Sequence, residues 1–270
     1  MKHRHTLMLS FVALPICVLL RAIQMYFTID DTTGFVKQQY SAISMTITVI
    51  ICAAVASVGL LAATIDGTKQ NENNLRPTVA ITSVLTGGMF VYQTVTGTSA
   101  LGGAWYNFLL VVLALASALV FLTFGLKNIY DYKMPLLMLT IPVAFYIVKL
   151  ISVFVSTSEL SLVTENIFII FTNIVLLWFV FEFASFENGM GDAEKQAKGL
   201  FASGLAAIIL CAVASIPKLA LASLGKMRMP ADDISEALLN LAMGIFILAY
   251  IVSNFKNKSK ITKSVGKHSA

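Results

Sequence analysis

The stretch that decides the fold is CVLLRAIQMYFTIDDTTGF, residues 17–35. It begins as a run of bulky apolar side chains, carries Arg21 within that run, and ends in acidic, hydroxyl and glycine residues. Followed upstream to residue 6, the apolar run reaches the roughly 20 residues that a helix needs to cross a bilayer. Arg21 is therefore an ionisable residue within a predicted membrane span, and such residues usually face the interior of a helix bundle.

Composition extends this interpretation to the whole chain. Of 270 residues, 57% are hydrophobic and only 12% are charged, whereas soluble domains carry roughly 25% charged residues. We predict an all-α, polytopic membrane helix bundle whose main partner is the lipid bilayer. The net charge of +5 does not indicate nucleic-acid binding, because the cations lie between apolar runs and at the carboxyl-terminal end.

Eight apolar runs have the length and composition of transmembrane helices. They predict one membrane domain over residues 1–258, followed by a basic tail over 259–270. Asp233 and Glu236 have the spacing of a capping box, which predicts the start of the last helix close to Asp233. The eight predicted spans are 6–27, 40–64, 78–95, 105–126, 134–156, 163–186, 198–219 and 234–254.

The loops predict an orientation. Most lysines and arginines outside the spans fall in segments that share a side with both termini, and positive loops stay in the cytoplasm. We therefore expect both termini to be cytoplasmic. The Lys-rich tail has two interpretations: it binds anionic lipid headgroups, at about 1 kcal/mol per cation near the surface, or it is a solvated segment that fixes topology.

A second stretch resembles the first. IPVAFYIVKLISVFVSTSEL (141–160) aligns with LPICVLLRAIQMYFTIDD (14–31), and each carries one cation, Lys149 or Arg21, after an early proline. Polar residues at 3, 7 and 10 positions beyond the cation share one helical face with it. These residues are Gln24, Thr28 and Asp31 in the first stretch, and Ser152, Ser156 and Glu159 in the second.

The two polar stripes predict an internal repeat. FGLKN (124–128) and SNFKN (253–257) are separated by nearly the same number of residues as the two aligned stretches, 14–31 and 141–160. We predict two tandem four-helix repeats, residues 1–130 and 131–258. Because each unit has an even number of spans, the two should be related by an axis along the membrane normal.

Two interpretations of the stripes stay open. In the first, the cations make local pairs, Arg21 with Asp30 or Asp31, and Lys149 with Glu159. In the second, both cations lie at the rim of one shared outer cavity and attract an anionic group, since intramembrane charges often mark functional sites. The ligand-binding residues of that second hypothesis are Arg21, Gln24, Thr28, Lys149, Ser152 and Ser156.

Other chemistry-bearing residues are few. Glu182, near the inner end of the sixth span, is a candidate for a proton or cation path, although at that depth it can also reach water. The histidines all lie near the chain ends, which excludes zinc-protease and serine–histidine chemistry within the membrane. We expect no catalytic residue, no metal site, no cofactor and no enzymatic activity. The three histidines are His3, His5 and His268.

The first span and the loop after it resemble those of a family of uncharacterised bacterial multi-pass membrane proteins. The resemblance implies a bacterial cytoplasmic membrane, and it implies no activity and no catalytic residues. It is carried by Arg21, Gln24, Ile29, Asp30, Thr33, Gly34 and Phe35.

Two classes of function are compatible with this sequence. One is a small transporter or permease-type subunit with a site between the two four-helix halves, where repeat proteins place such sites. The other is a non-transporting membrane anchor, sensor or assembly partner whose polar stripes hold helices together. A cavity lined by the stripes favours the first class, and dry helix contacts favour the second. A partner subunit or a homo-oligomer fits either class.

Overall fold

The computed structural model describes residues 2–28, 37–64, 76–97, 105–130, 134–157, 164–227 and 229–254. In these ranges the chain forms eight α-helices and no strand, as predicted, and all eight are long and apolar enough to cross a membrane. They are α1 (Lys2–Thr28), α2 (Ser41–Ala63), α3 (Pro77–Gly97), α4 (Trp105–Tyr130), α5 (Ile141–Thr157), α6 (Thr164–Glu187), α7 (Ala193–Ser223) and α8 (Ala231–Asn254).

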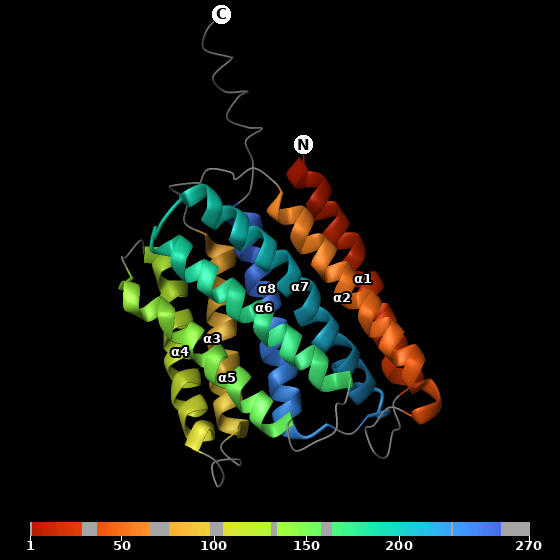
Figure 1. The fold of residues 1–270 in the computed structure, drawn as a ribbon. Helices are drawn as coiled ribbons and strands as arrows, with labels where there is room; N and C mark the ends of the chain where they lie inside the picture. Colours follow the sequence, from red (N-terminus) through yellow and green to blue (C-terminus); the bar gives the residue numbers. More distant parts are fainter. Residues whose placement is uncertain are drawn as a thin grey trace, which may run out of the picture.

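The first helix begins at the same end of the bundle as α8 finishes (Figure 1). We call this end the terminal face and the other end the opposite face. Successive helices alternate in direction, so α3, α5 and α7 run from the terminal face to the opposite face and α4, α6 and α8 return. Which face is cytoplasmic stays a prediction.

Some helices begin at residues other than those predicted, because a 3-10 turn or a capping side chain sets the boundary. A 3-10 turn, η3 (Leu136–Thr140), precedes α5, which places Pro142 in the first turn of the α-helix. A proline is tolerated there because its missing N–H would have no helical partner. At α7, the Asp192 side chain accepts a hydrogen bond of 3.1 Å from the Glu194 N–H. This N-cap lets α7 begin before the apolar run.

The predicted capping box of the last helix is wrong. The helix begins at Ala231, directly after Pro230, so Asp233 lies within the first turn and does not cap it. Proline fixes the backbone angle that starts a turn and thereby sets this earlier boundary. Glu236 is then one turn inside the helix, where its side chain can reach a neighbouring helix.

Six helices form a closed ring. Each of α3 to α8 contacts the next in sequence, and α8 closes the ring by packing against α3. The α1–α2 hairpin packs against α7 on the outside of this ring (Figure 1). Accordingly, 83% of the residues in the most apolar stretch of α7 are buried, whereas the corresponding share is 28–44% in α1 to α6. Helix α7 is therefore the central helix of the protein.

The ring does not follow the predicted repeat. In the described residues α6 packs against α7, but α2 and α3, which would be their equivalents, make no comparable contact. The two prolines that begin the matched stretches also differ in context, because Pro15 lies inside α1 and Pro142 lies at the start of α5. These contacts give the repeat no support, and it stays a prediction.

Aromatic side chains fill the inside of the ring. Phe145 packs edge-on against Phe90 with 5.1 Å between ring centroids, and Phe183 packs against Tyr250 at 5.0 Å. The rings come from five of the six ring helices and contact one another, so they can meet only in the interior. We call this set the aromatic column: Phe90, Phe121, Phe124, Phe145, Phe183, Phe246 and Tyr250, each at most 2% exposed.

Two adjacent glycines provide a test of the contact between α3 and α4. A β-carbon on Gly87 would lie 3.0 Å from the Ala118 carbonyl oxygen and 3.0 Å from Leu122 Cγ, whereas one on Gly88 would meet nothing within 4 Å. Gly87→Ala should therefore destabilise the protein by about 1–3 kcal/mol through overpacking. Gly88→Ala is the matched control and should leave the thermal midpoint unchanged or raised. Equal midpoints for the two variants would contradict this packing.

Candidate functional site

A cavity of about 240 Å³, with both polar and apolar side chains in its wall, lies toward the opposite face of the ring. It is lined by α3 and α4 from the first predicted half and by α5 and α8 from the second. Phe145, the first ring of the aromatic column, is also part of its wall. The polar lining residues are Gln93, Thr94, Asn107, Lys149, Ser152, Asp232, Asp233, Ser235 and Glu236.

The cavity contains an ion pair between two helices. Lys149 Nζ on α5 lies 2.9 Å from Glu236 Oε1 on α8, and the two side chains are 8% and 26% exposed. Lys149 is eight residues from the end of α5, which corresponds to about 12 Å along the axis. A lysine at this depth needs an opposite charge to offset its desolvation. The sequence predicted Glu159 as its partner, and Glu159 lies outside the described residues.

Carboxylates outnumber cations in the cavity wall. Asp232 and Asp233 lie in the first turn of α8, where the helix dipole favours negative charge, and Glu236 follows one turn later. Lys149 is the single cation among the lining residues, and Glu236 already pairs with it. Among the lining residues alone, three carboxylates face one cation. A small solute that carries both an ammonium and a carboxylate finds a partner of each sign.

The first polar stripe lies in a different environment. Arg21 is 1% exposed, donates a 2.9 Å hydrogen bond to Gln24 Oε1, and lies with its guanidinium carbon 4.1 Å from the centroid of the Phe168 ring. Gln24 Nε2 in turn faces α2, 2.8 Å from the Ser44 carbonyl oxygen and 2.9 Å from Thr48 Oγ1. This arrangement joins α1 to α2 and covers the arginine with an α6 aromatic ring.

The structure therefore brings together only part of the predicted ligand-binding set. Lys149 and Ser152 line the cavity, whereas Arg21 and Gln24 do not, and Thr28 bonds to the Gln24 carbonyl oxygen at 2.6 Å. An anion site at Arg21 stays a prediction. Other predicted residues fall outside what the structure describes; they are Asp30, Asp31, Glu159 and the side chain of Ser156.

Glu182 lies between α6 and α7. It accepts a hydrogen bond of 3.2 Å from Trp178 Nε1, one turn earlier on the same helix. Its carboxylate packs over Gly199, where an added β-carbon would lie only 2.7 Å away. Glu182 is not among the residues that line the cavity. Its assignment to a proton or cation path stays a prediction.

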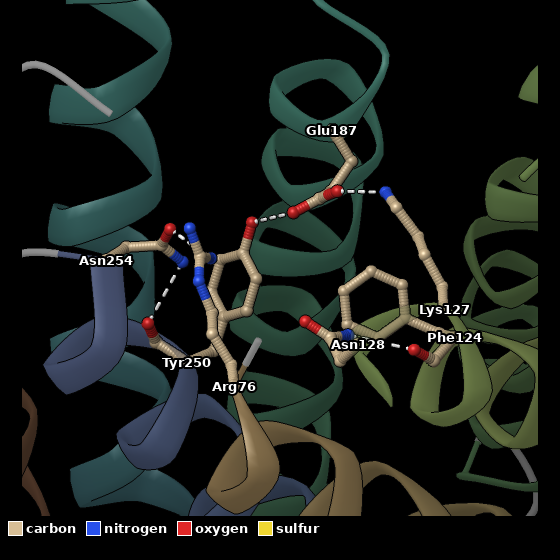
Figure 2. Close-up of polar contacts among 7 residues, drawn as sticks. All are labelled: Arg76, Phe124, Lys127, Asn128, Glu187, Tyr250 and Asn254. Atoms are coloured by element: carbon tan, nitrogen blue, oxygen red, sulfur yellow. Dashed lines mark hydrogen bonds and ion pairs between the residues drawn. The ribbon is translucent and has the colours of Figure 1, made fainter. Parts of the chain in front are cut away.

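A second cluster of polar side chains lies at the terminal face, where it bridges several ring helices (Figure 2). Glu187 at the end of α6 accepts a hydrogen bond of 2.5 Å from the Tyr250 hydroxyl and lies 2.6 Å from Lys127 Nζ of α4. Beside them Arg76 donates to Asn254 Oδ1, and Asn254 Nδ2 donates to the Tyr250 carbonyl oxygen at 3.0 Å. We call these five residues the terminal network. It links the residue that precedes α3 with α4, α6 and α8.

Sequence patterns did not find the terminal network. A carboxylate beside a helix terminus is common on protein surfaces, so no local spacing singled out Glu187. Its partners come from α4 and α8, 60 and 63 residues away in the chain.

Within the described ranges, no group of three or more His, Cys, Asp or Glu residues could hold a metal ion. No protein-family model, curated protein or solved structure matches this chain.

Proposed function

We propose that this integral membrane protein is a small-solute transporter or permease-type subunit whose substrate path follows the axis of the α3–α8 ring. One observation carries the proposal. A cavity with charged side chains in its wall lies toward one face, a hydrogen-bonded network lies at the other, and the aromatic column separates them inside a closed ring of helices. A binding site near one face, with the path to the other face closed, is one of the states that alternating access requires.

The cavity favours a small zwitterionic solute. Asp232 attracts an ammonium group, while Lys149 and Ser152 offer a cation and a hydroxyl to a carboxylate. The volume of about 240 Å³ is below the roughly 300–1,000 Å³ of pockets for drug-sized ligands. We therefore assign the substrate to the class of small amino-carboxylates, carried across a bacterial cytoplasmic membrane with both termini inside.

Passage requires two changes along the axis. Phe145 forms part of the cavity wall and contacts Phe90, so the solute moves on only when these rings separate. At the far end Glu187 must release Tyr250 and Lys127. The cycle needs no covalent chemistry, and the protein acts by binding and movement alone.

The first stripe favours a second candidate function for part of the chain. Arg21 and Gln24 are buried in helix contacts, which is what the non-transporting interpretation predicts. The α1–α2 hairpin lies outside the ring against α7. This position suits an anchor or an assembly element. If the protein is a sensor, the cavity of the ring binds a solute without transporting it.

Solute flux tests the proposal. The purified full chain in proteoliposomes should take up labelled small amino-carboxylates in a saturable way. Glu236→Gln keeps the shape of the side chain but removes the charge that holds Lys149, so uptake should fall by at least about tenfold, as expected for a lost charged partner.

Glu194→Gln is the matched control, because Glu194 is an exposed carboxylate at the terminal face whose i,i+4 ion pair with Lys198 lies outside the ring axis. It should transport like the parent. Uptake that is absent from every variant and from the parent, together with solute binding, would favour the sensor.

A further inference from the structure

Three buried polar side chains lie deeper than the cavity. Tyr146 on α5 and Ser215 on α7 are fully buried, and Asn240 on α8 is 5% exposed. The Tyr146 hydroxyl, Ser215 Oγ and Asn240 Oδ1 have no hydrogen-bond partner among the described residues. Asn240 is nine residues from the start of α8, about 13 Å along the axis, which is close to the middle of a bilayer core.

Helix register places these three groups together. A β-carbon on Gly244 of α8 would lie 3.1 Å from Cys211 Cβ of α7. Because α7 and α8 are antiparallel, one turn later on α7 faces one turn earlier on α8, which sets Ser215 opposite Asn240. Tyr146 lies three residues before Lys149 on α5 and so shares a helical face with it, and Lys149 pairs at 2.9 Å with Glu236, one turn from Asn240.

The cost of leaving these groups unpaired indicates a ligand. A buried hydroxyl or amide without a hydrogen bond costs roughly 1–3 kcal/mol, and native structures satisfy nearly all such groups. Ser203, also fully buried on α7, shows the usual solution, because its hydroxyl donates to the Gly199 carbonyl oxygen of its own helix at 2.8 Å. Ser215 makes no such bond.

We propose that Tyr146, Ser215 and Asn240 form, with the Glu236 carboxylate one turn above, a binding site for a monovalent cation of sodium size. All four supply oxygen atoms, which are the ligands that hard cations prefer. One carboxylate with three neutral oxygens matches a single positive charge, whereas calcium sites use several carboxylates. Coupling ions bind near the bilayer midplane in this way.

The site is linked to the solute cavity through one carboxylate. Glu236 pairs with Lys149 at 2.9 Å, so a cation that binds Glu236 from below competes with the lysine. Lys149 released from this pair presents its ammonium to the cavity and to the carboxylate of a solute. This coupling role rests on the proposed function, but binding of the ion does not.

Thermal unfolding of the full chain in lipid nanodiscs tests the site, with sodium, potassium and choline chlorides at equal ionic strength. Sodium near 100 times its Kd should raise the Tm by about 5–10 °C over choline. Tyr146→Phe and Ser215→Ala each remove one oxygen and should reduce this sodium shift at least about threefold, while Ser203→Ala should keep it. The comparison within each variant holds even if one substitution lowers the starting Tm.

Equal shifts with all three salts would overturn the ion site. So would a sodium shift that survives both Tyr146→Phe and Ser215→Ala, since water alone would then satisfy these groups. Solute uptake separates this inference from the proposed function. A sodium shift without uptake keeps the ion site and removes transport. Uptake that is equal in sodium and choline keeps transport and removes the coupling between ion and solute, while the Tm shift alone decides the ion site.

Discussion

Replacing Lys149 with methionine should lower the free energy of unfolding by about 3 kcal/mol. The substitution keeps the length of the side chain and leaves the Glu236 carboxylate without its cation. Glu236 is 26% exposed and Lys149 only 8%, so most of the penalty for a buried unpaired charge applies, which is roughly 3–5 kcal/mol. Chemical or thermal unfolding in nanodiscs measures the loss.

The double variant Lys149→Met with Glu236→Leu distinguishes the loss of one charge, which leaves the other unpaired, from the loss of both charges. Replacing both charges with apolar groups of similar size is often neutral, so the double variant should recover most of the lost stability. Lys198→Met is the control, because Lys198 makes a 3.0 Å pair with Glu194 on the exposed surface of α7, and such pairs contribute at most about 1 kcal/mol. A double variant less stable than Lys149→Met alone would show that the two charges are not coupled.

The sequence predicted the helices well because lipid imposes a simple rule. Each helix must be long and apolar enough to span the bilayer, and eight runs met that condition without reference to the rest of the chain. The ends were less predictable, since capping and 3-10 turns decide them. Asp192 extends α7 before its apolar run, and η3 delays α5.

The two polar stripes show where prediction from spacing stops. The spacing of Gln24 and Thr28 from Arg21 correctly placed them on one buried face of α1. It contained no information about which helix would cover that face, and α2 supplies the partners Ser44 and Thr48. Helical periodicity gives a direction for each side chain but not the neighbour it meets.

The same limit explains the Lys149 pair. Glu159, ten residues after Lys149, was the nearest candidate in sequence, whereas the structure places Glu236, 87 residues after Lys149, beside the lysine. The pairing follows from the ring, in which α8 closes back on α3 and brings its first turns next to α5 across the cavity. Ring order depends on packing of all six helices, and no single stretch determines it.

Glu187→Gln should open the terminal face. The change removes the charge that attracts Lys127 at 2.6 Å and weakens the acceptor of the Tyr250 hydroxyl. Hydrogen bonds to charged groups contribute about 1.5–3 kcal/mol. If the closed state loses that amount, the open population rises about 10- to 100-fold. The Glu194→Gln control leaves the terminal network intact and should change nothing.

The measurement that tests the central claim most directly is the reactivity of a cysteine in the cavity from each face of the membrane. Ser152→Cys, in a chain with Cys17, Cys52 and Cys211 replaced by alanine, is exposed to a charged, impermeant thiol reagent in vesicles of either orientation. A substrate path along the ring axis predicts reaction from the opposite face in every variant. It also predicts reaction from the terminal face that Glu187→Gln accelerates about 10- to 100-fold. A cysteine that reacts only from the opposite face, whichever residue is at position 187, would contradict a path through the ring.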